Sequence, residues 1–120
     1  MKKTERYPAG AVRLEGEADA DGGWDGIVSH YLETGVLRKQ TCYRAGVKCG
    51  REQVFRADGT LEQEIFYRDG LPSGAAVFYY PDGKKQREIF FEAGRILSSA
   101  EYKPDGLPDT SGQHFKSADI

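Results

Sequence analysis

The chain has 120 residues, of which 38% are hydrophobic and 15 are glycine, and its formal net charge is −2. A single domain of this length can bury a useful core, and the 7 Tyr and 6 Phe argue against a disordered chain. The near-neutral charge argues against a general affinity for nucleic acid, and no apolar run reaches the length of a membrane span.

The N-terminus, MKKTERYPAGAV, starts with basic residues but lacks the hydrophobic stretch of an export signal. We therefore expect a cytoplasmic protein. In that compartment the two cysteines, Cys42 and Cys49, are expected to be reduced thiols that pack as small apolar side chains.

The segment 14–37 is acidic, with six carboxylates and no Lys or Arg. Charged segments of this kind are commonly only solvated, but the one tryptophan of the chain lies within it, between glycines. Tryptophan is over-represented among the residues that anchor protein interfaces. We predict that this segment contacts a partner protein through Glu15, Glu17, Asp19, Asp21, Trp24, Asp25 and Glu33.

Glycines and aromatic residues recur every 24 residues from position 26 onwards. EIFYRDG at 64–70 returns as EIFFEAG at 88–94, and the aromatics Tyr43, Tyr67 and Phe91 keep the same step. Equal steps in several independent series indicate internal repeats. The glycine series are Gly26, Gly50 and Gly74; Gly35, Gly59 and Gly83; and Gly46, Gly70 and Gly94.

Each copy reads as a β-hairpin. A short strand ends in a turn such as ADG at 57–59, because Asp-Gly favours hairpin turns, and a second strand such as 61–68 ends at another glycine. In that second strand, Ile65 and Tyr67 face one way and Glu64 the other, with Phe66 as an exception. The sequence predicts an all-β fold of repeated antiparallel hairpins, forming an elongated meander sheet or an open roll, with the repeated aromatics largely buried.

The repeats divide the chain into one β-repeat domain, 1–106, and a loose polar tail, 107–120. Within the domain we expect a degenerate copy, three well-kept copies and a half copy. Their bounds are 1–25, 26–49, 50–73, 74–97 and 98–106.

No catalytic motif is evident, and we expect no enzyme activity, no cofactor and no metal site. Cys42, Cys49 and His30 have no zinc-type spacing, and His114 has no partner residue near it in sequence. The acids at 19, 21 and 25 resemble the start of a calcium loop, but position 30 is histidine where that loop requires glutamate.

The stretch GREQVFRADGTLEQEIFYRDGLPSG, at 50–74, resembles the bacterial variant of the MORN repeat (membrane occupation and recognition nexus). It shows the order glycine, four residues, aromatic, three residues, glycine, followed by a strand that ends in an aromatic and glycine. The resemblance covers roughly residues 26–106. It implies the fold expected above and, since many small proteins with this repeat resemble immunity proteins, a function of that kind.

Two functions fit these observations. The first is an immunity or antitoxin protein that binds a cognate bacterial toxin, such as a basic nuclease-type domain, and occludes its active site or substrate surface. The acidic segment would speed association with such a basic toxin. The alternative is a structural or scaffold repeat protein peripheral to a membrane, although no basic or amphipathic cluster in the sequence favours membrane binding.

Overall fold

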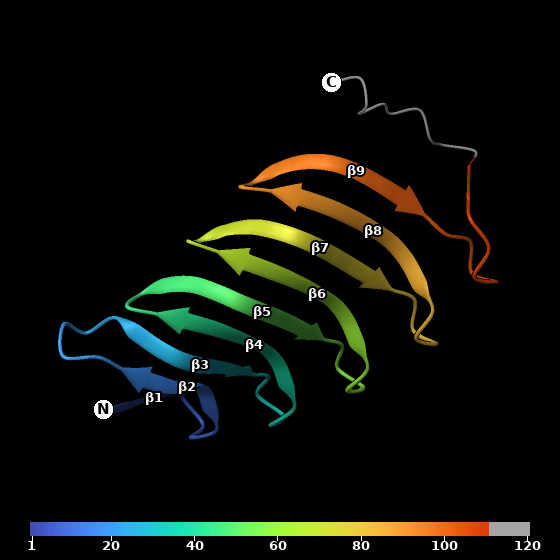
Figure 1. Ribbon diagram of the computed structural model, residues 1–120. Helices are drawn as coiled ribbons and strands as arrows, with labels where there is room; N and C mark the ends of the chain where they lie inside the picture. Colours follow the sequence, from blue (N-terminus) through green and yellow to red (C-terminus); the bar gives the residue numbers. More distant parts are fainter. Residues whose placement is uncertain (111–120) are drawn as a thin grey trace.

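The computed structural model describes residues 1–110 of the chain, and these residues form nine strands and no helix. All nine strands belong to one sheet whose spatial order is the order of the sequence, and every neighbouring pair is antiparallel. Figure 1 shows this meander, with the N-terminus at one end of the sheet and β9 at the other. The strands are β1 (Lys2–Arg6), β2 (Val12–Ala18), β3 (Trp24–Tyr31), β4 (Leu37–Arg44), β5 (Val47–Phe55), β6 (Leu61–Arg68), β7 (Leu71–Tyr79), β8 (Lys85–Glu92) and β9 (Arg95–Glu101).

Two kinds of turn join the strands of the sheet. At one end, two-residue turns join β4 to β5, β6 to β7 and β8 to β9. Both residues of each turn have positive φ, which is the backbone of a type I′ hairpin and matches the twist of the flanking strands. The first residues are Ala45, Asp69 and Ala93, with φ of 50°, 53° and 49°, and each is followed by glycine.

At the other end of the strands the turns are longer, and the turns 56–60 and 80–84 contain Asp-Gly. The amide of Gly59 donates to the carbonyl of Arg56 at 2.8 Å, and that of Gly83 donates to the carbonyl of Tyr80 at 2.9 Å. The Asp58 carboxylate accepts the amide of Thr60 at 2.9 Å, which fixes the backbone of the turn. The predicted tight turns at Gly59 and Gly83 are therefore confirmed.

The 24-residue period is visible in the hydrogen bonds between copies. Gly46 N donates to Trp24 O, Gly70 N to Lys48 O and Gly94 N to Pro72 O, at 2.7, 3.0 and 2.9 Å. Donors and acceptors both step by 24 residues. The prediction of an all-β fold of repeated hairpins is confirmed, and the form it takes is the open meander sheet.

One face of the sheet carries the core. A row of directly paired residues crosses β2 to β8 on this face, which we call the core face. Since no second layer covers the sheet in residues 1–110, the neighbouring side chains of the same face must bury this row. The row consists of Gly16, Val28, Thr41, Glu52, Ile65, Ala76 and Ile89.

The repeated aromatics occupy equivalent places but are less buried than the sequence predicts. Tyr43, Tyr67 and Phe91 each pair with a glycine of the preceding strand, Gly26, Gly50 and Gly74. All three rings are half-buried rather than largely buried, because a single-layer sheet has no opposing layer to cover them. Phe66 and Phe90, the exceptions in the predicted pattern, are each 40% exposed on the opposite face.

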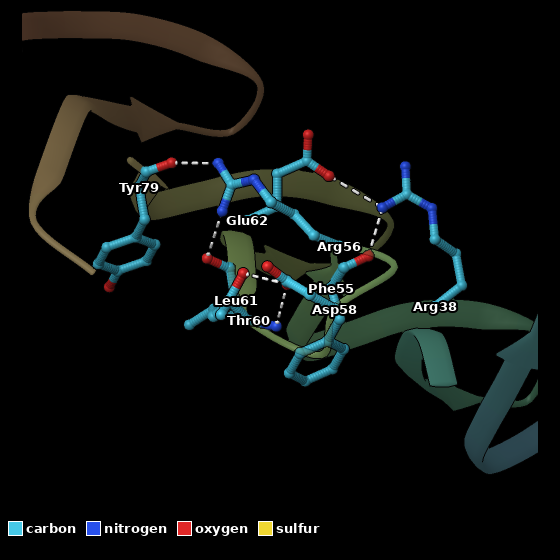
Figure 2. Close-up of polar contacts among 8 residues, drawn as sticks. All are labelled: Arg38, Phe55, Arg56, Asp58, Thr60, Leu61, Glu62 and Tyr79. Carbon is cyan, nitrogen blue, oxygen red and sulfur yellow. Dashed lines mark hydrogen bonds and ion pairs between the residues drawn. The ribbon is translucent and has the colours of Figure 1, made fainter. Parts of the chain in front are cut away.

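Side chains also connect each copy to the next one at the end with the longer turns. Figure 2 shows Arg56 donating to the carbonyl of Tyr79 at 2.6 Å, and Arg38 donating to the carbonyl of Phe55 and pairing with Glu62. Tyr7 and Tyr80 make the corresponding bonds to the carbonyls of residues 31 and 102, at 2.6 and 2.7 Å. These bonds hold successive hairpins in register at the end with the longer turns.

Candidate functional site

The core row departs from its own repeat in the middle of the sheet. Residues 28, 52 and 76 are equivalent by the 24-residue period, and they are valine, glutamate and alanine. Residues 41, 65 and 89 are also equivalent, and there threonine replaces isoleucine. Glu52 is 5% exposed and Thr41 is 1% exposed. A buried charge at a place where the fold itself accepts an aliphatic side chain is a candidate for function rather than for folding.

Three strands hold the Glu52 carboxylate. Thr41 on β4 donates its hydroxyl to Glu52 Oε2 at 2.7 Å, and Tyr67 on β6 donates its hydroxyl to Oε1 at 3.3 Å. Lys48 Nζ lies 3.1 Å from Oε2 and 4.7 Å from the centre of the Tyr67 ring. We call Thr41, Lys48, Glu52 and Tyr67 the Glu52 cluster. Its hydrogen bonds and ion pair offset the cost of burying the carboxylate.

A glycine in β5 brings Lys48 toward Glu52. Opposite Cys42 of β4, the strand β5 has three residues, 49–51, between the pairs that Tyr43 makes with Lys48 and Thr41 makes with Glu52. Gly50 lies in this bulge with φ of 72°, which glycine adopts without steric cost. The bulge therefore brings the side chains of Lys48 and Glu52, which are four residues apart, close together on the core face.

The charges of the cluster stabilise one another. Burial would raise the pKa of Glu52, but the hydrogen bond from Thr41 and the Lys48 ammonium outweigh it, and the pKa is lowered. Burial would lower the pKa of Lys48, but its bond to Glu52 and the charge of that carboxylate raise it. Burial and then the Glu52 charge raise the pKa of the Tyr67 hydroxyl. The cluster therefore holds a carboxylate, an ammonium and a neutral phenol at neutral pH.

A groove opens beside the cluster on the core face. It has a volume of about 400 Å³, and Glu52, His30, Lys39 and Gln63 line it together with Arg38 and Val54. Burial lowers the pKa of His30, and the positive charges of Lys39 and Arg13 lower it further. The groove thus offers an ammonium, a guanidinium, an amide and a neutral imidazole beside the Glu52 carboxylate, which suits binding of a polar side chain of a partner.

Basic side chains lie over aromatic rings across the same face. Besides Lys48 over Tyr67, Lys3 Nζ lies 5.0 Å from the Trp24 ring and Arg87 lies 5.2 Å from the Phe78 ring. Cations over ring faces are attracted by the ring quadrupole. The core face therefore combines an aromatic surface with positive charge.

The structure divides the acidic residues predicted to contact a partner. Glu15 and Glu17 extend from β2 on the face opposite the core, where they pair with Lys2 and the N-terminal ammonium. Glu33 lies in the turn 32–36, at the far end of β3 from the turn 19–23. The six carboxylates that are contiguous in sequence therefore do not form one surface.

The remaining predicted residues gather around the β2–β3 turn. Asp19 accepts the amides of Asp21 and Gly23, both at 3.0 Å, and Asp25 accepts the amide of Ala45 at 3.1 Å. Trp24 is half-buried on the core face, where its ring lies against Gly16: a Cβ there would come within 3.1 Å of it. Asp19 and Asp25 thus have structural bonds, and Trp24 packs on the sheet.

Sequence reasoning missed the Glu52 cluster, although a signal for it was present. Aligning the copies at 24 residues shows glutamate between valine and alanine in one column and threonine before two isoleucines in another. Within residues 1–110, no group of three or more His, Cys, Asp and Glu side chains is placed to hold a metal ion. His114 lies outside the described residues.

Comparison with known proteins gives one family. The MORN repeat variant matches residues 24–45, 48–69 and 72–93, which together make up more than half of the chain. The chain belongs to the MORN repeat variant family. Its matches have the same 24-residue spacing as the hairpins, and they indicate a repeat-type binding or scaffold protein. No curated protein and no solved structure matches the chain significantly.

Residues 1–110 contain no helix that could span a lipid bilayer.

Proposed function

We propose that this MORN-variant protein is an immunity or antitoxin protein that binds a cognate bacterial toxin and occludes its active site or substrate surface. The observation that carries the proposal is the Glu52 cluster beside its groove, on the open face of a thin sheet. The fold measures 47 × 31 × 17 Å, so this face is broad for so small a chain. A broad face with a polar centre and aromatic surroundings suits a protein partner.

The acidic β2–β3 turn supports the same proposal through association rate. A basic toxin domain is attracted to exposed carboxylates before contact, and such steering raises the rate of association at low salt. Asp21 is the exposed carboxylate of this turn, and its side chain makes no hydrogen bond or ion pair within residues 1–110. It is therefore the cleanest position for testing steering.

The direct experiment uses the gene neighbourhood. We expect an adjoining reading frame to encode a protein with a toxin-like C-terminal domain. Co-expression of that domain with this protein should restore cell growth, and the two should purify as one complex. Growth that stays arrested, with no complex formed, would contradict the proposal. Sedimentation of the protein with phospholipid vesicles, without any toxin binding, would favour a membrane-peripheral scaffold instead.

The groove is tested by reversing one charge on each face. Lys39→Glu places a negative charge in the groove on the core face, and we expect faster dissociation of the toxin complex at every salt concentration. Arg95→Glu makes the same charge change on exposed β9 and is the matched control. Equal affinities for the wild type and both variants would place the interface elsewhere.

Steering is tested with two acidic positions at opposite ends of β3. Asp21→Lys should slow association at low salt and have little effect at high salt, because the Debye length falls to about 3 Å at 1 M. Glu33→Lys makes the same change at the far end and should leave the association rate closer to that of the wild type. Identical association rates for all three proteins at low salt would show that the acidic turn plays no part.

A further inference from the structure

The two cysteines of the chain lie in contact on one hairpin. Cys42 is on β4 and Cys49 is on β5, and their Sγ atoms are 3.5 Å apart. Both side chains are partly exposed and neither is oxidised in the structure. This contact takes no part in the Glu52 cluster.

The β5 bulge places the two thiols together. Cys42 lies opposite residues 49–51, and Gly50 lies directly beside it: a Cβ on this glycine would be 3.9 Å from Cys42 Cβ. In the next two copies, the position of Cys42 is occupied by Phe66 and Phe90. The position of Cys49 is occupied there by serine and leucine. The β4–β5 hairpin thus has a thiol at both positions, and the next two copies have none.

A second groove gives small molecules access to Cys49. It has a volume of about 670 Å³ and lies between two successive type I′ turns. Besides Cys49, three cationic residues line it: Arg44, Lys48 and Arg68. Asp69 is the one carboxylate among its lining residues. The excess of positive charge favours an anionic reagent.

We propose that Cys42 and Cys49 form a reversible dithiol–disulfide site that is oxidised by a low-molecular-weight disulfide carrying carboxylates, such as oxidised glutathione. The Cys49 thiolate attacks one sulfur of the reagent, a mixed disulfide forms and one thiol leaves. The Cys42 thiolate then attacks the Cys49 sulfur and releases the second thiol. Two electrons and two protons pass from the protein thiols to the reagent, which ends as two thiols.

The order of the two steps follows from the surroundings of each sulfur. Cys49 lines the groove, so the reagent reaches it first. Burial raises the pKa of Cys42, and the neighbouring Cys49 raises it further, so the Cys42 thiolate is scarce at neutral pH. As the second nucleophile, Cys42 acts within one molecule at contact distance, which compensates for this scarcity.

The first experiment titrates the reduced full-length protein with oxidised glutathione. Free thiols are counted after denaturation under acid quench, and the intact mass is measured. We expect the thiol count to fall from two to zero, with the mass lowered by two hydrogens and no glutathione retained. Dithiothreitol should restore both thiols. Persistence of two thiols, or glutathione that stays attached, would overturn the proposal.

Single variants test the order of attack. Cys42→Ser should accumulate a stable glutathione adduct on Cys49, because the second nucleophile is missing. Cys49→Ser should react more slowly, because Cys42 does not line the groove. Adduct formation at equal rates in both variants would contradict the assigned order.

A reagent for paired thiols tests proximity without any substitution. Phenylarsine oxide forms a stable ring only with two neighbouring thiols. We expect the native wild-type chain to bind one arsenical and to retain it against excess monothiol. An arsenical that the monothiol removes would show that the thiols are not paired in solution, even if the serine variants fail to fold.

Discussion

Glu52 shows how a single side chain can depart from the repeat without breaking the sheet. Its equivalents, Val28 and Ala76, are 1% exposed and apolar, whereas Glu52 is 5% exposed and charged. The charge is tolerated because Thr41, Lys48 and Tyr67 all bond to it. The polar groups of the Glu52 cluster therefore stabilise the fold together. Removing one of them should destabilise the protein more than replacing buried Thr41 and Glu52 at the same time.

Restoring the apolar pattern of the repeat tests this directly. Glu52→Val alone leaves the hydroxyls of Thr41 and Tyr67 without their acceptor, and we expect a loss of about 1–3 kcal/mol in the free energy of unfolding. Thr41→Ile with Glu52→Val places at both positions an aliphatic residue that occurs at the equivalent position of another copy, and it should recover most of that loss. Urea denaturation measures both variants. A double variant that is less stable than the single one would show that the site cannot accept the aliphatic pair.

The same cluster makes the protein sensitive to acid. The pKa of Glu52 is lowered in the fold from its ordinary value of 4.5, so the unfolded chain takes up a proton first as the pH falls. The stability that ionised Glu52 contributes is therefore complete above about pH 4.5 and is lost as the pH falls through the lower, folded value. Unfolding free energies measured between pH 7 and 3 should fall more steeply for the wild type than for Thr41→Ile/Glu52→Val. Parallel curves of unfolding free energy against pH for the two proteins would contradict the assignment of this acid sensitivity to Glu52.

At the scale of the element, the hairpin turns set the register of the sheet. Type I′ turns require positive φ at both central residues, and glycine fills the second place in all three. The first place holds alanine twice, although alanine adopts this conformation less readily than asparagine does. These turns are strained where Ala45 and Ala93 lie, and the strands on either side compensate.

Ala93→Asn should relieve one of these turns. Asparagine tolerates the φ of 49° found at this position, and Asn-Gly is a preferred sequence of the type I′ turn. We expect the protein to become more stable by about 0.5–1 kcal/mol. Ala93→Val is the matched control, and it should be destabilising because a β-branched side chain clashes at positive φ. Thermal unfolding distinguishes them, and equal midpoints would mean that the turn does not limit stability.

At the scale of the whole molecule, the sheet is a linear array. Each strand pairs only with its sequence neighbours, so each hairpin depends on the adjacent hairpins rather than on distant parts of the chain. Arrays of this kind tolerate the loss or gain of whole units, because the new neighbours present equivalent surfaces. The side-chain bonds to the carbonyls of residues 31, 55, 79 and 102 follow the same rule.

Deleting residues 50–73 tests the array. This deletion joins Cys49 to Gly74, which occupies the place of Gly50 one copy later. The direction of the strands and the face of the sheet on which each side chain lies are therefore preserved. We expect a cooperatively folded β-protein whose urea m-value is lower by roughly a fifth, in proportion to its smaller buried surface. Deleting 56–79 instead, a segment of equal length that begins inside a turn, serves as the control for the choice of junction. Failure of both variants to fold would show that the copies are not interchangeable.

The sequence by itself determined the hairpins, the turns and the period. Turn glycines and the alternation of apolar and polar residues along a strand are local signals. Each depends only on the backbone freedom of a few consecutive residues, or on the side of the strand to which their side chains point. That is why Gly59, Gly83 and the equivalence of Tyr43, Tyr67 and Phe91 could be predicted before any coordinates.

Only the tertiary structure decided which side chains share a surface. The acidic segment is continuous in sequence, yet Asp21 and Glu33 lie in turns at opposite ends of β3, and Glu15 extends from β2 on the face opposite the core. The reason is that neighbouring residues of a strand alternate between faces and a hairpin reverses direction. Thr41, Glu52 and Tyr67 are far apart in sequence but meet because strand pairing aligns them across β4, β5 and β6. The tertiary structure also decided how far the rings of Tyr43, Tyr67 and Phe91 are buried, because only a second layer over the sheet would cover them.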